Sequence, residues 1–131
     1  MNQDINEIIK QSDFAIQEGI FVYTKVKTLP KAGNHFMVSQ DKDEITVVTL
    51  EENLKDLDLV ERNKEDYKLI SLNVSVPFYA VGFLAMISSA IAKNGMNLLI
   101  VSTYSKDYIL IKKEKLKDAH QALIDLGFQE K

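Results

Sequence analysis

The hydrophobic pattern of this chain changes period along its C-terminal half, and each period predicts one kind of element. The runs YKLISLNVS (67–75), MNLLIVSTY (96–104) and YILIKK (108–113) are rich in aliphatic, β-branched and aromatic residues, which predicts strands. Residues 80–94 and 114–126 carry apolar side chains three and four positions apart, the spacing of amphipathic helices. The order strand, helix, strand, strand, helix predicts an α+β unit of the split βαβ, ferredoxin-like kind.

Glycines mark the expected ends of both helices. Gly95 follows Asn94 and Gly127 follows Leu126, and each glycine suits the left-handed position just past a helix. Phe128 then begins a short final strand. The apolar stripes expected to be buried are Val81, Leu84, Ile87 and Ile91 on the first helix and Leu116, Ala119, Leu123 and Leu126 on the second.

The N-terminal half has a different pattern. Ile5, Ile8 and Ile9 fall at helical spacing, which predicts a short leading helix whose face Phe14 continues. Gly19 ends this helix or starts the next strand. Turn-like segments then separate three β-rich runs, which we expect to form an antiparallel sheet: GIFVYTKV (19–26), HFMVSQ (35–40) and EITVVTL (44–50).

Charge divides the chain near Asp66. Residues 1–66 carry 14 acidic and 8 basic side chains, a net −6, whereas residues 67–131 carry 5 acidic and 8 basic ones, a net +3, and the two sum to the whole-chain −3. The segment 51–66 is the most charged part of the sequence and predicts a boundary, with a short helix as its alternative. We therefore expect two modules, residues 1–66 and residues 67–131.

Composition excludes several classes of protein. A net charge of −3 with a single arginine, Arg62, is the wrong footprint for nucleic acid. The first residues have neither the basic nor the apolar region of a signal peptide, and the longest apolar run is shorter than the roughly 20 residues of a membrane span. We expect a cytoplasmic protein without nucleic-acid or membrane partners.

Catalytic and metal motifs are not found in the sequence. There is no Gly-rich phosphate loop, no G-x-S-x-G elbow, no H-E-x-x-H and no cysteine. His35 and His120 have no partner at metal-ligand spacing and are assigned to surface or hydrogen-bonded positions. We expect a protein that is not an enzyme and that carries no cofactor or metal.

The loop before the helix at 80–94 and the turn after residue 101 are the candidate binding elements. Backbone amides at a helix N-terminus favour a carboxylate, and Gly82 would let a ligand come close. Ser102 and Thr103 offer hydroxyls, and Asp107 can accept from an ammonium or guanidinium group. Simpler alternatives stay open: Gly82 as a packing residue, Ser102 and Thr103 as plain strand residues, and Asp107 as a turn former.

The segment SVPFYAVGFLAMISSAIAKNGMNLLIVSTYSKDYILIKKEKLKDAHQALIDLGF resembles the ACT domain, within the branch of small stand-alone tandem ACT proteins related to the CASTOR-type sensors. The resemblance rests on the Val81-Gly82 loop end, the Asn94-Gly95 turn and the Ser-Thr-Tyr…Asp hairpin. It implies βαββαβ modules in tandem, with antiparallel sheets and helices on one face, that bind an amino acid or similar ligand at a module interface in a regulatory role. The ligand-binding residues it implies are Ser75, Val76, Pro77, Phe78, Val81, Gly82, Ser102, Thr103 and Asp107.

Two functions follow from the sequence. The first is a non-catalytic regulatory or sensing protein whose partner is a small-molecule ligand. The second is a protein–protein interaction module that keeps the fold without a functional pocket. In either case the sheet of residues 67–113 has an outer edge that the N-terminal module or a second chain should cover, so we expect a tandem arrangement within the chain and a homodimer.

Overall fold

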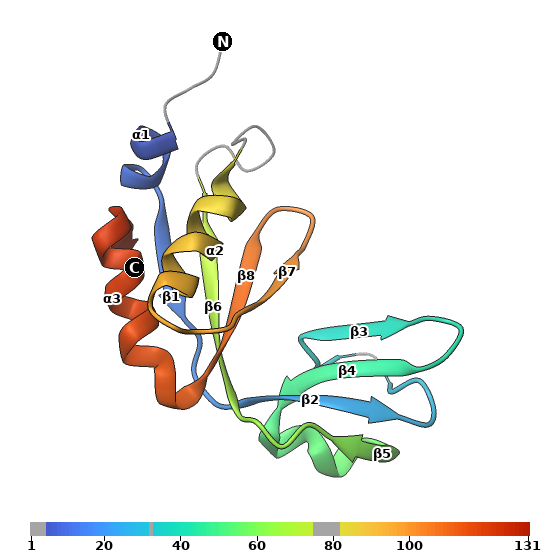
Figure 1. The fold of residues 1–131 in the computed structure, drawn as a ribbon. Helices are drawn as coiled ribbons and strands as arrows, with labels where there is room; N and C mark the ends of the chain where they lie inside the picture. Colours follow the sequence, from blue (N-terminus) through green and yellow to red (C-terminus); the bar gives the residue numbers. More distant parts are fainter. Residues whose placement is uncertain (1–4, 32, 75–81) are drawn as a thin grey trace. The chain divides into compact units, whose positions relative to one another are not determined.

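Residues 5–31, 33–74 and 82–131 are described by a computed structural model of the chain. They fall into two compact units (Figure 1). Unit 1 comprises Met1–Glu18 and Lys68–Lys131, and unit 2 comprises Gly19–Tyr67. None of the described helices is long and apolar enough to cross a membrane.

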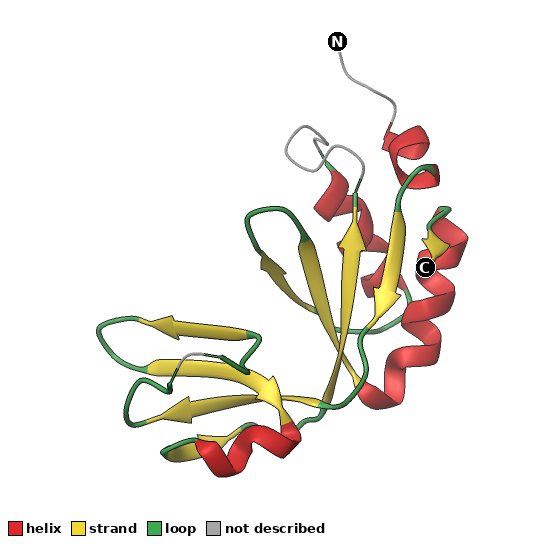
Figure 2. Cartoon of the chain, turned by 180° about the vertical axis from the view of Figure 1, so that it is seen from behind, coloured by secondary structure: helices red, strands yellow, loops and turns green. Residues whose placement is uncertain are grey.

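Unit 1 contains the predicted ferredoxin-like order of elements, which is confirmed. Its sheet runs β9-β1-β6-β8-β7, with β7 antiparallel to β8 and β1 antiparallel to β6. Two helices, α2 and α3, cover one face of this sheet, as Figure 2 shows. The elements are α1 (Ile5–Lys10), β1 (Asp13–Ile16), β6 (Tyr67–Asn73), α2 (Phe83–Lys93), β7 (Leu99–Ser102), β8 (Asp107–Lys112), η3 (Lys113–Lys115), α3 (Leu116–Leu126) and β9 (Gln129–Glu130).

Strand β1 was not predicted from the sequence. Phe14 was expected to continue the leading helix, but that helix ends at Lys10 and Phe14 lies in β1. The expectation was wrong because β1 is held by long-range pairing: Asp13 lies opposite Asn73 of β6 on one side and Gln129 of β9 on the other. The first strand of the ferredoxin-like unit is thereby separated from its last by a strand from the N-terminus.

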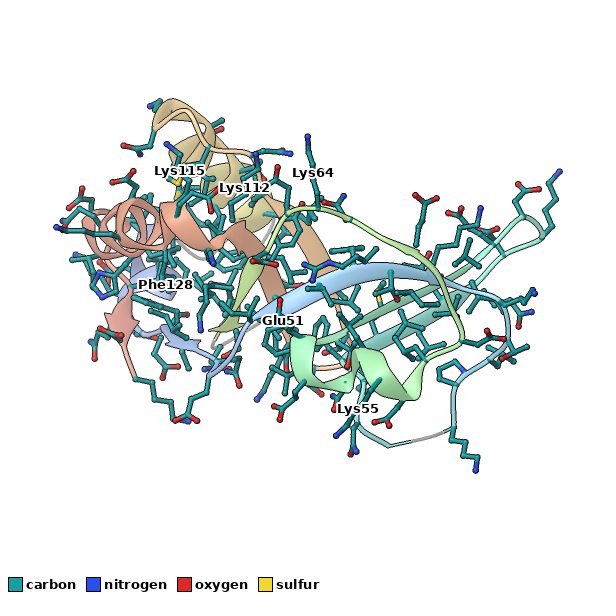
Figure 3. The ribbon with its side chains drawn as sticks, turned by 90° about the horizontal axis from the view of Figure 1, so that it is seen from below. Glu51, Lys55, Lys64, Lys112, Lys115 and Phe128 are labelled. Carbon is teal, nitrogen blue, oxygen red and sulfur yellow. The ribbon has the colours of Figure 1, made fainter. Side chains whose placement is uncertain are left out.

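The core of unit 1 lies between the sheet and the helices. Phe128, labelled in Figure 3, is almost fully buried, and its ring meets those of Phe14 and Phe83 edge to face at 6.4 and 5.9 Å. The other buried members of this cluster are Ile9, Ile70, Leu72, Ile87, Ile91, Met96, Ile109, Ile111, Ala119, Ala122 and Leu123.

Helix α2 begins later than predicted. Gly82 has φ 83° and ψ 0°, a left-handed conformation that an α-helix does not contain, so the helix starts at Phe83. Phe83 takes a buried place on the helix and Leu84 is only partly buried, while the predicted Val81 lies outside the described residues. The predicted helix ends at Gly95 (φ 74°) and Gly127 (φ 114°) are confirmed.

Unit 2 is an antiparallel sheet of order β3-β4-β2-β5, and the three strands predicted there are confirmed. The charged segment after them contains a 3-10 helix, in line with the alternative of a short helix there, and a fourth strand that was not predicted. The sequence of β5, LVER, does not alternate between apolar and polar residues, and three of its four residues are exposed. The elements are β2 (Phe21–Val26), β3 (Met37–Gln40), β4 (Ile45–Leu50), η1 (Glu51–Asp56) and β5 (Leu59–Arg62).

The division of the chain into two ACT-like modules, residues 1–66 and residues 67–131, stays a prediction. In space, residues 1–18 belong to the same compact unit as residues 68–131. The lone arginine, Arg62, stabilises the end of unit 2 through ion pairs with Glu51 at 3.3 Å and Asp66 at 2.6 Å.

Candidate functional site

A cavity of about 460 Å³ lies between the first turn of α2 and the β7–β8 hairpin, both in unit 1. Figure 1 shows the hairpin beside the start of this helix. The residues that line the cavity are Gly82, Phe83, Leu84 and Ala85 on the helix side and Ser102, Thr103, Tyr104, Ser105, Lys106 and Asp107 on the hairpin side.

The hairpin holds one carboxylate at a fixed place on the cavity wall. Ser102 and Asp107 are cross-strand partners, and the Ser102 hydroxyl donates to Oδ1 of Asp107 at 2.6 Å. The backbone N–H and the hydroxyl of Thr103 both donate to the carbonyl of Lys106, at 2.8 and 3.2 Å, and close the turn. Asp107 is the first residue of β8. Its carboxylate is thus held by the hydroxyl of Ser102 on the neighbouring strand.

The start of α2 forms the opposite wall. The carbonyl of Gly82 accepts the first helical hydrogen bond, from the Met86 N–H at 3.0 Å. The amides of the first turn have no partner within the helix, and the dipole places partial positive charge there. This turn contains no acidic residue. A Cβ built on Gly82 would meet no atom within 4 Å, so the space in front of this backbone is open.

Four of the nine residues predicted for the site line this one cavity. Gly82, Ser102, Thr103 and Asp107 are brought together there from two elements. The other five, Ser75, Val76, Pro77, Phe78 and Val81, lie outside the described residues.

The remaining lining residues were not predicted from the sequence. Leu84 and Ala85 line the cavity because α2 starts directly after Gly82. Their place in the site could be predicted only once this helix start was known. Tyr104 is 89% exposed and lines the cavity. Lys106 lies in the turn directly before Asp107. This neighbouring position in the sequence was the signal that could have predicted Lys106 as a lining residue.

The described lining residues offer charges and hydrogen-bonding groups, and none of them is a histidine or cysteine. Among the described residues no three His, Asp or Glu side chains gather as metal ligands. His35 contacts the Thr49 hydroxyl at 2.9 Å and His120 contacts the Glu130 carboxylate at 2.8 Å, so both are hydrogen-bonded away from this cavity, as predicted. The described lining therefore presents a carboxylate on one wall and the partial positive charge of a helix N-terminus on the other.

Comparisons with known proteins address the fold. The model of the ACT domain family matches residues 63–125, just under half of the chain. A search of curated proteins found no match.

Solved structures resemble the whole chain. A protein of unknown function from Vibrio cholerae, described as a possible transport protein, shares 22% identity with a TM-score of 0.78, over 94% of this chain and 95% of that one. A protein from Agrobacterium tumefaciens shares 17% identity with a TM-score of 0.73, over 92% of each chain. The ligand-free regulatory subunit of aspartate kinase from Thermus thermophilus shares 12% identity with a TM-score of 0.62, over 86% and 96%. The chain therefore has a mixed α+β, ACT-like fold.

Proposed function

We propose that this protein is a non-catalytic regulatory or sensing protein that binds an amino acid or a similar small ligand in the cavity between α2 and the β7–β8 hairpin. The observation that carries the proposal is the pairing of two opposite walls: the first-turn amides of α2, which have no partner within the helix, on one side and the Ser102-bound carboxylate of Asp107 on the other. An α-amino acid presents a carboxylate and an ammonium group that match these walls.

The geometry also gives each group a role. The ligand carboxylate would accept from the amides at the start of α2, and its ammonium would donate to Asp107. Ser102 holds Oδ1 of Asp107 and leaves Oδ2 for the ligand. A binding role for Ser75, Val76, Pro77, Phe78 and Val81, which lie outside the described residues, stays a prediction from the sequence.

The comparisons support a regulatory role. The matched family model is that of the ACT domain, and one of the similar structures is named as a regulatory subunit of aspartate kinase. The relation to CASTOR-type sensors and a tandem arrangement of two ACT-like modules belong to the same proposal, as do a cytoplasmic location and a homodimeric state.

A ligand screen tests the proposal directly. The full chain is heated in the presence of each of the common amino acids, and hits are measured by calorimetry. A ligand that binds only the folded state stabilises it by about 2.7 kcal/mol at 100 times its Kd, which raises the melting temperature. If no amino acid raises it and calorimetry shows no heat of binding, the ligand role is wrong, and the ACT-like fold would then serve as a protein–protein interaction module.

A further inference from the structure

Lys106 lies next to Asp107 on the rim of the cavity and has no ion-pair partner among the described residues. We infer that the preferred ligand is a dicarboxylic amino acid, whose second acidic group pairs with Lys106. This inference rests on the proposed function, and it specifies the ligand class for the same site.

The charge balance of the cavity leads to this class. Among the described residues, its lining contains one carboxylate, Asp107, one ammonium group, Lys106, and the positive end of α2. A zwitterionic amino acid uses Asp107 for its ammonium and the α2 amides for its carboxylate. Lys106 is then left without a counter-charge, and a side-chain carboxylate on the ligand supplies one.

A cationic side chain on the ligand is disfavoured, because it would meet Lys106 as a like charge.

Neutral ligands match the lining less well. An amide side chain, as in asparagine or glutamine, has the size of the acid without its charge, so the Lys106 ammonium gains no ion pair. An apolar side chain has Leu84 and Tyr104 as its contacts, and Tyr104 is 89% exposed. The isosteric pairs glutamate and glutamine, and aspartate and asparagine, therefore isolate the contribution of the second carboxylate.

The experiment measures the affinity of the full chain for these four amino acids by calorimetry. We expect each acid to bind about two- to fivefold tighter than its amide, the range of an exposed ion pair. Salt should reduce this ratio, because exposed charges are screened. The melting temperature gives an independent order for the same ligands.

Lys106→Gln should bring the ratio of acid to amide affinity close to one while amide binding persists. The backbone carbonyl of Lys106, which closes the turn with Thr103, is kept in this variant. Lys93→Gln is the matched control: it removes the same charge from the C-terminal end of α2, away from the cavity, and should leave the ratio unchanged.

The outcomes distinguish a wrong ligand class from a wrong binding site. Amides that bind as tightly as the acids, or an acid preference that survives in Lys106→Gln, would overturn the dicarboxylic class and leave the amino-acid site standing. Absence of binding by any amino acid would overturn the proposed function and this inference together.

Discussion

Asp107 owes its place in the cavity to its neighbour across the hairpin. The Ser102 hydroxyl donates to the Asp107 carboxylate at 2.6 Å, and this bond fixes the carboxylate on the wall opposite α2. On the opposite wall, Gly82 has a left-handed backbone directly before α2, and the space where its side chain would stand is open. Together the two residues define where a ligand's charged ends would lie.

Replacing Asp107 by asparagine should weaken ligand binding. Asp107→Asn removes the ionised acceptor, and hydrogen bonds to charged groups contribute about 1.5–3 kcal/mol, so affinity should fall roughly ten- to a hundredfold. Calorimetry with the best ligand of the screen measures the change. The matched control is Asp125→Asn on α3, outside the cavity. Unchanged affinity in Asp107→Asn would return this residue to a purely structural role in the hairpin.

Gly82→Val should abolish binding by filling the approach to the α2 amides. Its backbone cost is that of a left-handed non-glycine residue, about 1–3 kcal/mol. Gly95→Val is a close control, since Gly95 also has a positive φ, 74°, and open space at its Cβ, but does not line the cavity. We expect similar losses in the free energy of unfolding for the two variants and a loss of binding in Gly82→Val alone. Binding retained in Gly82→Val would place the site elsewhere.

The raised pKa of Tyr23 in unit 2 leads us to expect that the free energy of unfolding falls at alkaline pH. Burial raises the pKa of the Tyr23 phenol above 10.0, and the nearby Tyr67, whose ring centroid is 5.8 Å away, raises this pKa further. The folded state therefore favours the neutral phenol. The resulting stabilisation is fully present below pH 10 and is lost as pH rises through the folded-state pKa.

Urea unfolding between pH 9 and 11.5 measures this effect. Stability should fall over the upper part of the range, and the fall should be smaller in Tyr23→Phe. Tyr104→Phe removes an exposed phenol and serves as the control. An equal fall in Tyr23→Phe and the unmodified chain would show that burial of Tyr23 does not set the alkaline limit.

At the scale of elements, the C-terminal half of the chain was predicted well because its signals are local. The periodicity of α2 and α3 and the glycines that end them are written in consecutive residues, and the structure confirms both helices and the strands around them. Strand β1 depends on pairing with β6 and β9, far along the chain, and four residues of β1 alone carry no such information. Strand β5 was missed for a related reason, since its mostly exposed residues show no alternation.

The candidate site was predicted where it depends on local sequence and missed where it depends on packing. Gly82 and the hairpin residues were found because a helix start and a polar turn are local features. That α2 begins at Phe83, and that Tyr104 and Lys106 line the cavity, follow from how the helix packs on the sheet.

Strand β1 should be required for unit 1 to fold. Phe14 in its centre is fully buried and packs against Phe128 and His120. Phe14→Ala should lower the free energy of unfolding by about 3–5 kcal/mol, the usual cost of emptying a buried phenylalanine site. Denaturant unfolding followed by circular dichroism checks this value.

A fragment of residues 67–131 should lack cooperative unfolding, because it leaves β6 and β9 without the strand between them. The full chain under the same conditions is the reference. A fragment that folds as a stable monomer would show that β1 is dispensable, and would also contradict the proposed tandem arrangement.

At the scale of the whole molecule, the proposed homodimer concerns the outer edge of unit 1. Among the described strands β7 pairs only with β8, so its other edge carries backbone groups that an additional strand can pair. Ile100 in β7 is 38% exposed, which adds an apolar side chain to this edge. Such an edge is a site for self-association in a small domain.

Light scattering on the full chain should give twice the chain mass of 14.9 kDa. Ile100→Lys should shift the equilibrium toward monomers by at least tenfold in the dimer Kd, because a lysine on an edge strand opposes strand pairing. Ile124→Lys introduces the same charge at an isoleucine of equal exposure, 38%, on α3, and should leave the dimer intact. A monomer mass at all concentrations would refute the dimer. Dissociation by Ile124→Lys but not by Ile100→Lys would instead place the contact on the helical face, with the β7 edge left free in solution.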